Sequence, residues 1–159
     1  VPLRNTGSAL SAFNAFQLLQ GIETLPLRME RHCDNALTVA NHLKSHAQVD
    51  WVSYAGLEDH EHHNLAQKYM GGKASGILTF GVKGGFDAGV AFYDKLKLFK
   101  RLVNIGDAKS LACHPASTTH RQLTEDEQRS VGVSAETIRL SVGIEHIDDI
   151  LEDLDQALS

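Results

Sequence analysis

The sequence predicts a mixed α/β (α+β) domain in which helices cover a sheet, and three observations support this fold class. Short stretches rich in β-branched and aromatic residues alternate with stretches whose apolar residues recur every three or four positions. The 159 residues suffice for one domain with a substantial core. No repeat or low-complexity segment interrupts the pattern. We therefore expect one domain over residues 1–159, with a helical lead-in at 1–45 and a sheet-and-helix sandwich at 46–159.

Two helices are expected in the lead-in. Residues 8–20 are rich in helix formers with apolar residues at helical spacing, and Gly21 suits a C-terminal stop. A second helix is predicted from the start signal Thr24-Leu25-Pro26 to about Ser45, because apolar residues follow the 3.6-residue period there.

The sandwich is expected to alternate strands and helices. A surface loop at 58–64 follows the first strand because this stretch is strongly charged. We expect strands at 49–54, 77–82 and 137–142, short extended segments at 102–105 and 110–113, helices at 86–99 and 124–129, and a closing helix whose core face is Ile147, Ile150, Leu151, Leu154 and Leu158.

Composition excludes several classes of protein. The net charge is −5 and the basic residues are scattered, which argues against nucleic-acid binding. No apolar run approaches the roughly 20 residues that span a bilayer, so we expect no membrane span. Cys33 and Cys113 lie far apart, which suits free thiols in a reducing cytoplasm. The opening Val1-Pro2-Leu3-Arg4 has no initiator Met and no signal-peptide pattern, which indicates a start inside a longer protein.

The stretch from Ile138 to Ile144 is the most informative candidate site. Strand alternation places Ile138, Leu140 and Val142 on one face and sets Arg139 among small residues on the other. A guanidinium on a rigid strand with small neighbours has room for a planar anion, and its forked donors match a carboxylate. The alternative is a structural salt bridge to one of the 20 acidic residues.

Two polar connections are weaker candidates. The segment 104–110 contains Asn104 and a glycine, and such connections often present amide groups to a ligand. The segment 114–120 has a hydroxyl run with Thr119 between two imidazoles, and either a ligand site or a turn would explain it. The turn is the favoured interpretation.

Other motifs are interpreted without a function. The histidines at 60, 62 and 63 fail the HExxH spacing, so a solvated loop is favoured over a metal site. The glycines at 71–76 precede a strand, and those at 84–85 lack the GxGxxG spacing, so both are expected to be turns. No Ser/His/Asp or Cys/His set has a spacing that supports nucleophilic catalysis.

Four separated strings, in this order, resemble the Cys/Met-metabolism family of pyridoxal-phosphate enzymes. They are Gly21–Met29, Asn104–Leu111, His114–His120 and Ile138–Glu145. The resemblance extends from about Gly7 to Leu158, and the second string is most similar to the O-acetylhomoserine sulfhydrylase branch. Several motifs in one order are far more specific than any single motif.

The resemblance implies a C-terminal small domain of fold type I, with an antiparallel-type sheet covered by helices, beside an absent cofactor domain. By position, Arg139 matches the family arginine that clamps the substrate α-carboxylate. Asn104 falls where related lyases carry a serine that helps hold the same carboxylate, and Thr119 matches a threonine near the bound substrate. The resemblance implies no catalytic, cofactor-binding or metal-binding residue in this chain.

The implied reaction of the full-length parent makes homocysteine from O-acetylhomoserine and sulfide or a thiol, in methionine biosynthesis. The parent is expected to be a cytoplasmic homotetramer that binds pyridoxal phosphate, without nucleic-acid or membrane partners. The family's Schiff-base lysine lies in an upstream Ser-x-x-Lys context that this chain lacks, so Lys73, Lys95 and Lys109 are not assigned that role. The fragment alone is therefore expected to be inactive. The alternatives are a methionine or cystathionine γ-lyase or γ-synthase of the same family, and a non-catalytic binding module.

Overall fold

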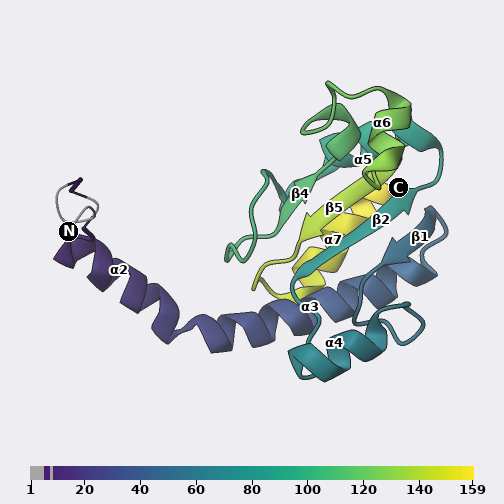
Figure 1. The fold of residues 1–159 in the computed structure, drawn as a ribbon. Coiled ribbons are helices and arrows are strands. Elements are labelled where there is room, and N and C mark those ends of the chain that lie inside the picture. Colours follow the sequence, from purple (N-terminus) through teal and green to yellow (C-terminus); the bar gives the residue numbers. More distant parts are fainter. Residues whose placement is uncertain (1–5, 8) are drawn as a thin grey trace.

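A five-stranded sheet with helices packed against it forms the body of the protein in this computed structural model (Figure 1), which describes residues 6, 7 and 9–159. The elements in chain order are α2 (Ala12–Glu23), α3 (Leu25–Ser45), β1 (Val49–Ser53), α4 (His63–Met70), β2 (Ile77–Val82), α5 (Gly85–Lys95), β3 (Lys100–Arg101), β4 (Leu111–Cys113), a 3-10 turn η1 (Pro115–Ser117), α6 (Glu125–Ser130), β5 (Thr137–Ser141) and α7 (Ile147–Leu158). The expected fold class is confirmed.

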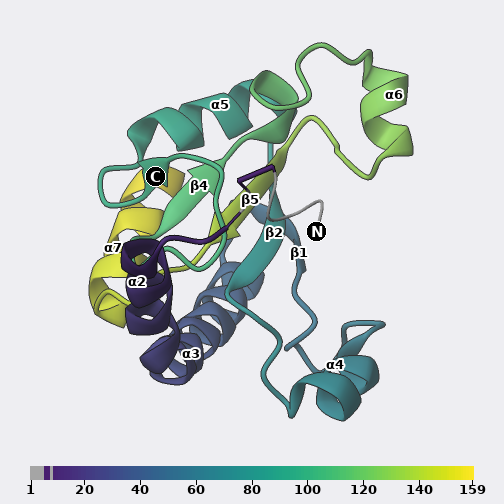
Figure 2. The same cartoon turned by 60° about the vertical axis from the view of Figure 1, so that its left-hand side comes forward.

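The sheet has the order β1-β2-β5-β4-β3, so β5 is its central strand. Its pairs are antiparallel except for the short parallel pair β3–β4. Helices α3, α5 and α7 cover one face of the sheet (Figure 2). The antiparallel-type sheet that the family resemblance implied is therefore present, with one exception at the β3 edge.

The core lies between the sheet and these three helices. Leu78 and Phe80 of β2 lie on the same face as Ile138 and Leu140 of β5, and all four are buried at 2% exposure or less. The Phe80 ring meets Phe92 of α5 edge-on, with ring centroids 5.4 Å apart. Burying each such side chain contributes roughly 1.5–3 kcal/mol, so the predicted strand alternation also accounts for the core.

Helix α2 differs from its expected bounds at both ends. It begins at Ala12, where the Ser11 hydroxyl caps the helix by accepting from Asn14 N at 3.1 Å. Ser8, the expected start, and Val1-Pro2-Leu3-Arg4 lie outside the described residues. The helix runs through the expected stop at Gly21 to Glu23, because Pro26 lacks the N–H that would continue the helical hydrogen bonds past Thr24.

The expected helix at 86–99 is wrong at its end, since α5 stops at Lys95. The carboxylate of Asp153, buried on α7, accepts the backbone N–H groups of residues 97–99 at 2.9, 2.9 and 3.0 Å. These donors can no longer bond to carbonyls of the preceding turn, so the chain straightens there. An acid 54 to 56 positions away in sequence ends the helix.

One further expectation is wrong, and another is wrong only at its end. The extended segment expected at 102–105 is a loop, and the strand lies just before it at Lys100–Arg101, where β4 is within reach for pairing. The loop expected at 58–64 ends early, because α4 begins at His63. Helix α4 buries only Ala66, while its other large apolar residues, Leu65, Tyr69 and Met70, are exposed.

The remaining short elements follow their local signals. Helix α6 has the expected capping box, in which Thr124 and Glu127 bond to each other's backbone N–H. The glycine pairs at 71–72 and 84–85 are turns with positive φ, as expected. In the part of the chain that the structure describes, no helix is long and apolar enough to cross a membrane.

Candidate functional site

Arg139 stands in the middle of the sheet on the face away from the core helices. It lies on the central strand β5, opposite Thr79 of β2 and Cys113 of β4 in the strand register. Directly opposed residues share a face of the sheet, so the guanidinium has small neighbours on both sides. The side chain is half-buried. The predicted placement of an arginine among small residues is confirmed.

Within the described residues, the Arg139 guanidinium makes one hydrogen bond. Nη2 donates to the backbone carbonyl of Asn104 at 3.4 Å, which is long for an N–H···O bond. Among residues 6, 7 and 9–159, no acidic side chain forms an ion pair with Arg139. The structural salt bridge considered as the alternative is therefore not formed within the described chain, and most of the five guanidinium donors stay unused.

Asn104 is brought to Arg139 through its backbone. Its exposed side chain accepts the N–H of Ile105 through Oδ1 at 2.9 Å, which orients the side-chain amide. The two candidate residues are 35 positions apart in sequence and adjacent in space. A carboxylate on the guanidinium would lie at this loop.

Thr119 is not joined to the other two candidates by any contact found in the described residues. Its hydroxyl lies 2.8 Å from Nδ1 of its neighbour His120, and the residue is exposed. The preceding Thr118 hydroxyl donates to the carbonyl of His114 at 2.7 Å and lies 3.3 Å from the Cys113 sulfur. The hydroxyl run thus forms the turn that the sequence favoured, directly after the strand neighbour of Arg139.

The loop that carries Asn104 is anchored at its far end by Glu145. The carboxylate of Glu145 accepts the backbone N–H of Ser110 at 2.7 Å and its hydroxyl at 2.9 Å. Ser110 Oγ in turn accepts the N–H of Gly143 at 2.8 Å, and Ile144 N donates to Ala108 O at 3.0 Å. We did not identify this anchor from the sequence. The available signal was that Glu145 is the last residue of one of the family-like strings.

Position 143 needs a glycine because the anchoring residues pass very close to its Cα. A Cβ at Gly143 would lie 2.2 Å from Glu145 Oε2, 2.5 Å from Ser110 N and 2.6 Å from Ala108 O. Two of these atoms belong to the backbone and cannot move aside independently, so the loop can approach β5 only where a side chain is absent.

Side chains of α3 hydrogen-bond to the backbone that follows β5. The Asn35 side-chain amide donates to the carbonyls of Gly143 and Glu145 at 3.0 and 3.1 Å. His32, one turn earlier, lies with Nδ1 2.6 Å from the carbonyl of Val142. His32 and Asn35 therefore fix the backbone between Arg139 and Glu145, although they lie more than 100 positions earlier in the sequence.

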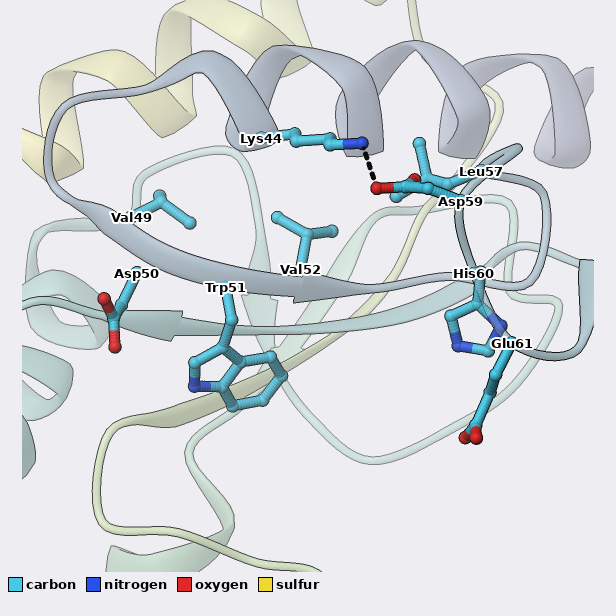
Figure 3. A pocket seen from close by; sticks show the side chains of 9 residues that line it. All are labelled: Lys44, Val49, Asp50, Trp51, Val52, Leu57, Asp59, His60 and Glu61. Carbon is cyan, nitrogen blue, oxygen red and sulfur yellow. Dashed lines mark hydrogen bonds and ion pairs between the residues drawn. The ribbon is translucent and has the colours of Figure 1, made fainter.

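A broad hollow of about 500 Å³ lies elsewhere, at the edge strand β1 (Figure 3). Figure 3 shows Val52 and the ion pair Lys44–Asp59 on one side of the strand, and Trp51 on the other. The hydrogen bond from Lys44 lowers the pKa of the exposed Asp59 carboxyl. Because the lining side chains point to different sides, they do not converge on one ligand position, and none of our candidate residues lines this hollow.

The surroundings of the lysines bear on a covalent aldehyde cofactor. A lysine that attacks an aldehyde must lose its proton, which burial or a nearby cation promotes. All eight lysines are exposed. Lys73 illustrates the opposite environment, because its hydrogen bond to Asp34, 2.9 Å long, raises its pKa.

The clustered histidines are engaged with neighbours in their own segment. His60 Nε2 lies 3.1 Å from the hydroxyl of Ser53, and His63 Nε2 lies 3.2 Å from the side-chain amide of Gln67. Within the described ranges, no group of three or more His, Cys, Asp or Glu residues is arranged to hold a metal ion.

Comparison with known proteins adds to this geometry. Residues 2–159 match the family model described as Cys/Met metabolism PLP-dependent enzyme. The chain is 52% identical to O-acetyl-L-homoserine sulfhydrylase 1 of Thermus thermophilus, covering 99% of this chain and 37% of that protein. It is 56% identical to O-acetyl-L-homoserine sulfhydrylase of Leptospira meyeri, with coverages of 98% and 36%. For the homocysteine synthase of Schizosaccharomyces pombe the identity is 53%, with the same coverages.

A solved structure has the same fold over nearly the whole chain. It is a Campylobacter jejuni protein assigned as an O-acetylhomoserine (thiol)-lyase, with a pyridoxyl-lysine phosphate at its position 205. The TM-score is 0.88 at 46% sequence identity, covering 98% of this chain and 37% of that one. The chain thus spans a little over a third of the length of these relatives.

Proposed function

Because this chain belongs to the Cys/Met metabolism family of pyridoxal-phosphate-dependent enzymes, we propose that it is the carboxylate-binding C-terminal domain of an O-acetylhomoserine sulfhydrylase. The full-length parent would convert O-acetylhomoserine and sulfide into homocysteine and acetate. Identities of 52% and 56% to two relatives named O-acetyl-L-homoserine sulfhydrylase support this reaction over the γ-lyase and γ-synthase alternatives.

Arg139 is the residue that we propose holds the substrate carboxylate. The supporting observation is a half-buried guanidinium on the central strand, with no acidic partner among the described residues and a single long bond to a carbonyl. A planar carboxylate can accept two parallel N–H bonds from such a group. This fixes the orientation of the amino acid, which is a positioning effect on the reaction.

Asn104 and Thr119 are proposed as supporting substrate contacts. The carbonyl of Asn104 bonds Arg139, and its side-chain amide, oriented by Ile105 N, offers a second donor beside the guanidinium. Thr119 follows the strand neighbour of Arg139 by six residues and carries an exposed hydroxyl. We expect Thr119 to contribute less, because it makes no contact with either of the others in the described structure.

The cofactor chemistry is proposed to come from the rest of the parent. Pyridoxal phosphate supplies an electron sink that makes bonds near the amino-acid Cα labile. None of the eight lysines of this chain has the buried setting that an imine-forming lysine needs, since all are exposed. We therefore propose that the fragment alone is inactive and that its own residues bind and orient the substrate.

The parent is further proposed to be a cytoplasmic homotetramer. Cys33 and Cys113 are both free thiols and buried, which suits a reducing compartment. Sedimentation velocity of the full-length parent tests the oligomeric state, and cell fractionation tests the compartment.

Acetate release from O-acetylhomoserine with sulfide tests the proposed function. The parent and this chain are assayed side by side with added pyridoxal phosphate, and homocysteine is quantified. We expect both products with the parent and neither with this chain. Turnover by the chain alone would overturn its assignment as a binding domain. A parent that is inactive here but turns over cystathionine or methionine would support the γ-lyase alternative instead.

A further inference from the structure

A small cavity lies beside the proposed carboxylate site. Its volume is about 40 Å³, enough for one small molecule. Ile105 and Gly106 of the Asn104 loop form part of its wall, and Ile77 lies on the same face of β2 as Thr79, the strand neighbour of Arg139. Its lining residues are Met29, His32, Ser75, Gly76, Ile77, Ile105, Gly106 and Val142.

His32 brings an unsatisfied nitrogen to this cavity. The side chain is 1% exposed, and Nδ1 lies 2.6 Å from the carbonyl oxygen of Val142. A carbonyl oxygen only accepts, so Nδ1 carries the hydrogen, and an Nε2 without a hydrogen is an acceptor. Nε2 is buried and has no partner among the described residues. Leaving such a group unsatisfied is costly, so a buried polar atom of this kind indicates a bound partner.

Several other polar groups of the cavity wall are paired with neighbours. Val142 N donates to Gly76 O at 2.8 Å, and the Tyr54 hydroxyl donates to Ser75 O at 2.8 Å. Ser75 Oγ accepts the N–H of Ile77 at 3.2 Å, which leaves its own hydrogen free to be donated. Among its polar side chains, the cavity has the His32 ring and the Ser75 hydroxyl, within walls made largely by Met, Ile and Val side chains.

We propose that this cavity binds hydrogen sulfide, the sulfur donor of the proposed reaction, with one S–H directed to Nε2 of His32. The inference rests on the proposed function. The walls are formed largely by apolar side chains, which do not supply the roughly three hydrogen bonds that a buried water usually makes. A thiol group behaves as a small hydrophobe with a weak S–H donor, and sulfur packs well against methionine and aliphatic side chains. The site would hold the nucleophile next to the clamped amino acid.

His32→Asn in the full-length holoenzyme tests the site. The asparagine amide can still donate to Val142 O, as Nδ1 does, but the Nε2 acceptor is removed. We expect the KM for sulfide to rise about tenfold, as for a lost hydrogen bond, while the KM for O-acetylhomoserine is unchanged. His62→Asn is the matched control, because His62 is exposed and does not line this cavity.

The outcomes separate this inference from the proposed function. If the wild-type parent makes no homocysteine from sulfide, the proposed function itself is contradicted. An active parent whose His32→Asn variant keeps the wild-type KM for sulfide would overturn the sulfide site alone. Equal rises of both KM values would assign His32 a purely structural role and also overturn it.

A second experiment does not depend on turnover. Crystals of the full-length holoenzyme are soaked with hydroselenide, whose selenium is located by anomalous scattering. We expect a selenium peak beside His32 Nε2, which is absent after Ile77→Phe, a change that fills the cavity while leaving His32 in place. Density for water alone in the wild-type cavity would contradict the proposal.

Discussion

At the scale of single residues, what matters for binding is which polar groups the fold leaves unused. Arg139 donates one long bond to Asn104 and has no acidic partner in the described chain. Asp153, by contrast, is buried with its carboxylate fully occupied by three backbone donors. A satisfied charge stabilises the fold, whereas a half-buried charge with free donors favours an external ligand.

Arg139→Lys in the full-length parent tests the bidentate clamp. Lysine keeps the charge but loses the planar fork. We expect the KM for O-acetylhomoserine to rise about ten- to a hundredfold, since a bond to a charged group contributes roughly 1.5–3 kcal/mol. Steady-state kinetics measure it, with Arg129→Lys on the α6 surface as the control. Unchanged kinetics in Arg139→Lys would contradict the assignment of Arg139 as the carboxylate-binding residue.

His114 is expected to make stability depend on pH. The ring is fully buried between Ser117 Oγ and Ala135 O, each 2.8 Å from a ring nitrogen. Burial lowers its pKa below the ordinary 6.5, so the folded state binds fewer protons than the unfolded state below that pH. This loss of stability is absent above about pH 6.5 and grows as the pH falls below it.

Urea unfolding at several pH values from 7.5 to about 5 tests this effect. We expect His114→Gln to flatten the decline of unfolding free energy on the acidic side, and His120→Gln, at a more accessible ring, to leave it unchanged. Parallel curves for wild type and His114→Gln would contradict the lowered pKa of His114.

At the scale of elements, the loop between β3 and β4 is anchored at its far end by the carboxylate of Glu145. Leu102, Val103 and Ile105 are more than half exposed, so apolar burial does not hold the loop. The bonds from Ser110 to Glu145 do so instead. Because Asn104 lies in this loop, the geometry beside Arg139 depends on an anchor at the loop's other end.

Glu145→Gln is expected to loosen this loop. Glutamine has one acceptor oxygen, so one of the two Ser110 bonds is lost and its donor is left in a partly buried position. We expect a loss of about 1–3 kcal/mol in unfolding free energy and faster amide hydrogen exchange over residues 102–110. Glu152→Gln on exposed α7 surface is the control. Wild-type exchange rates in Glu145→Gln would show that the loop is held by other contacts.

At the scale of the whole molecule, α2 extends from the body and presents apolar side chains (Figure 1). It buries none of its residues, and Phe13 and Phe16 are 67% and 57% exposed. Exposed apolar patches of this kind mark contact surfaces. Since relatives named O-acetyl-L-homoserine sulfhydrylase are almost three times longer than this chain, we expect the rest of the parent to cover α2.

The isolated chain is therefore expected to self-associate through α2. Sedimentation velocity should show a mass that rises with concentration, and the double variant Phe13→Gln with Phe16→Gln should stay monomeric to higher concentration. Its thermal midpoint should match wild type, because neither ring is buried. The control is Gln17→Asn on the same helix. Equal association of wild type and double variant would place the contact elsewhere.

Much of the fold could be predicted because its signals are local. The long apolar period of α3, the alternation in β2 and β5 and the Thr124 capping box all gave elements close to those observed. Errors arose where a distant residue decides, as at α5, which Asp153 ends. The segment 102–105 has the composition of a strand but no partner strand beside it.

The sequence by itself determined the fold class, the core faces of the strands, the placement of Arg139 among small residues and the resemblance to the family. Only the tertiary structure decided that Asn104 meets Arg139 through its carbonyl and that Glu145 anchors the intervening loop. It also placed His32 in the wall of a cavity, with a ring nitrogen that has no partner among the described residues. The reason is physical: periodicity reports which way a side chain points relative to its own backbone, whereas pairing across 33 to 110 residues depends on how the sheet and α3 pack.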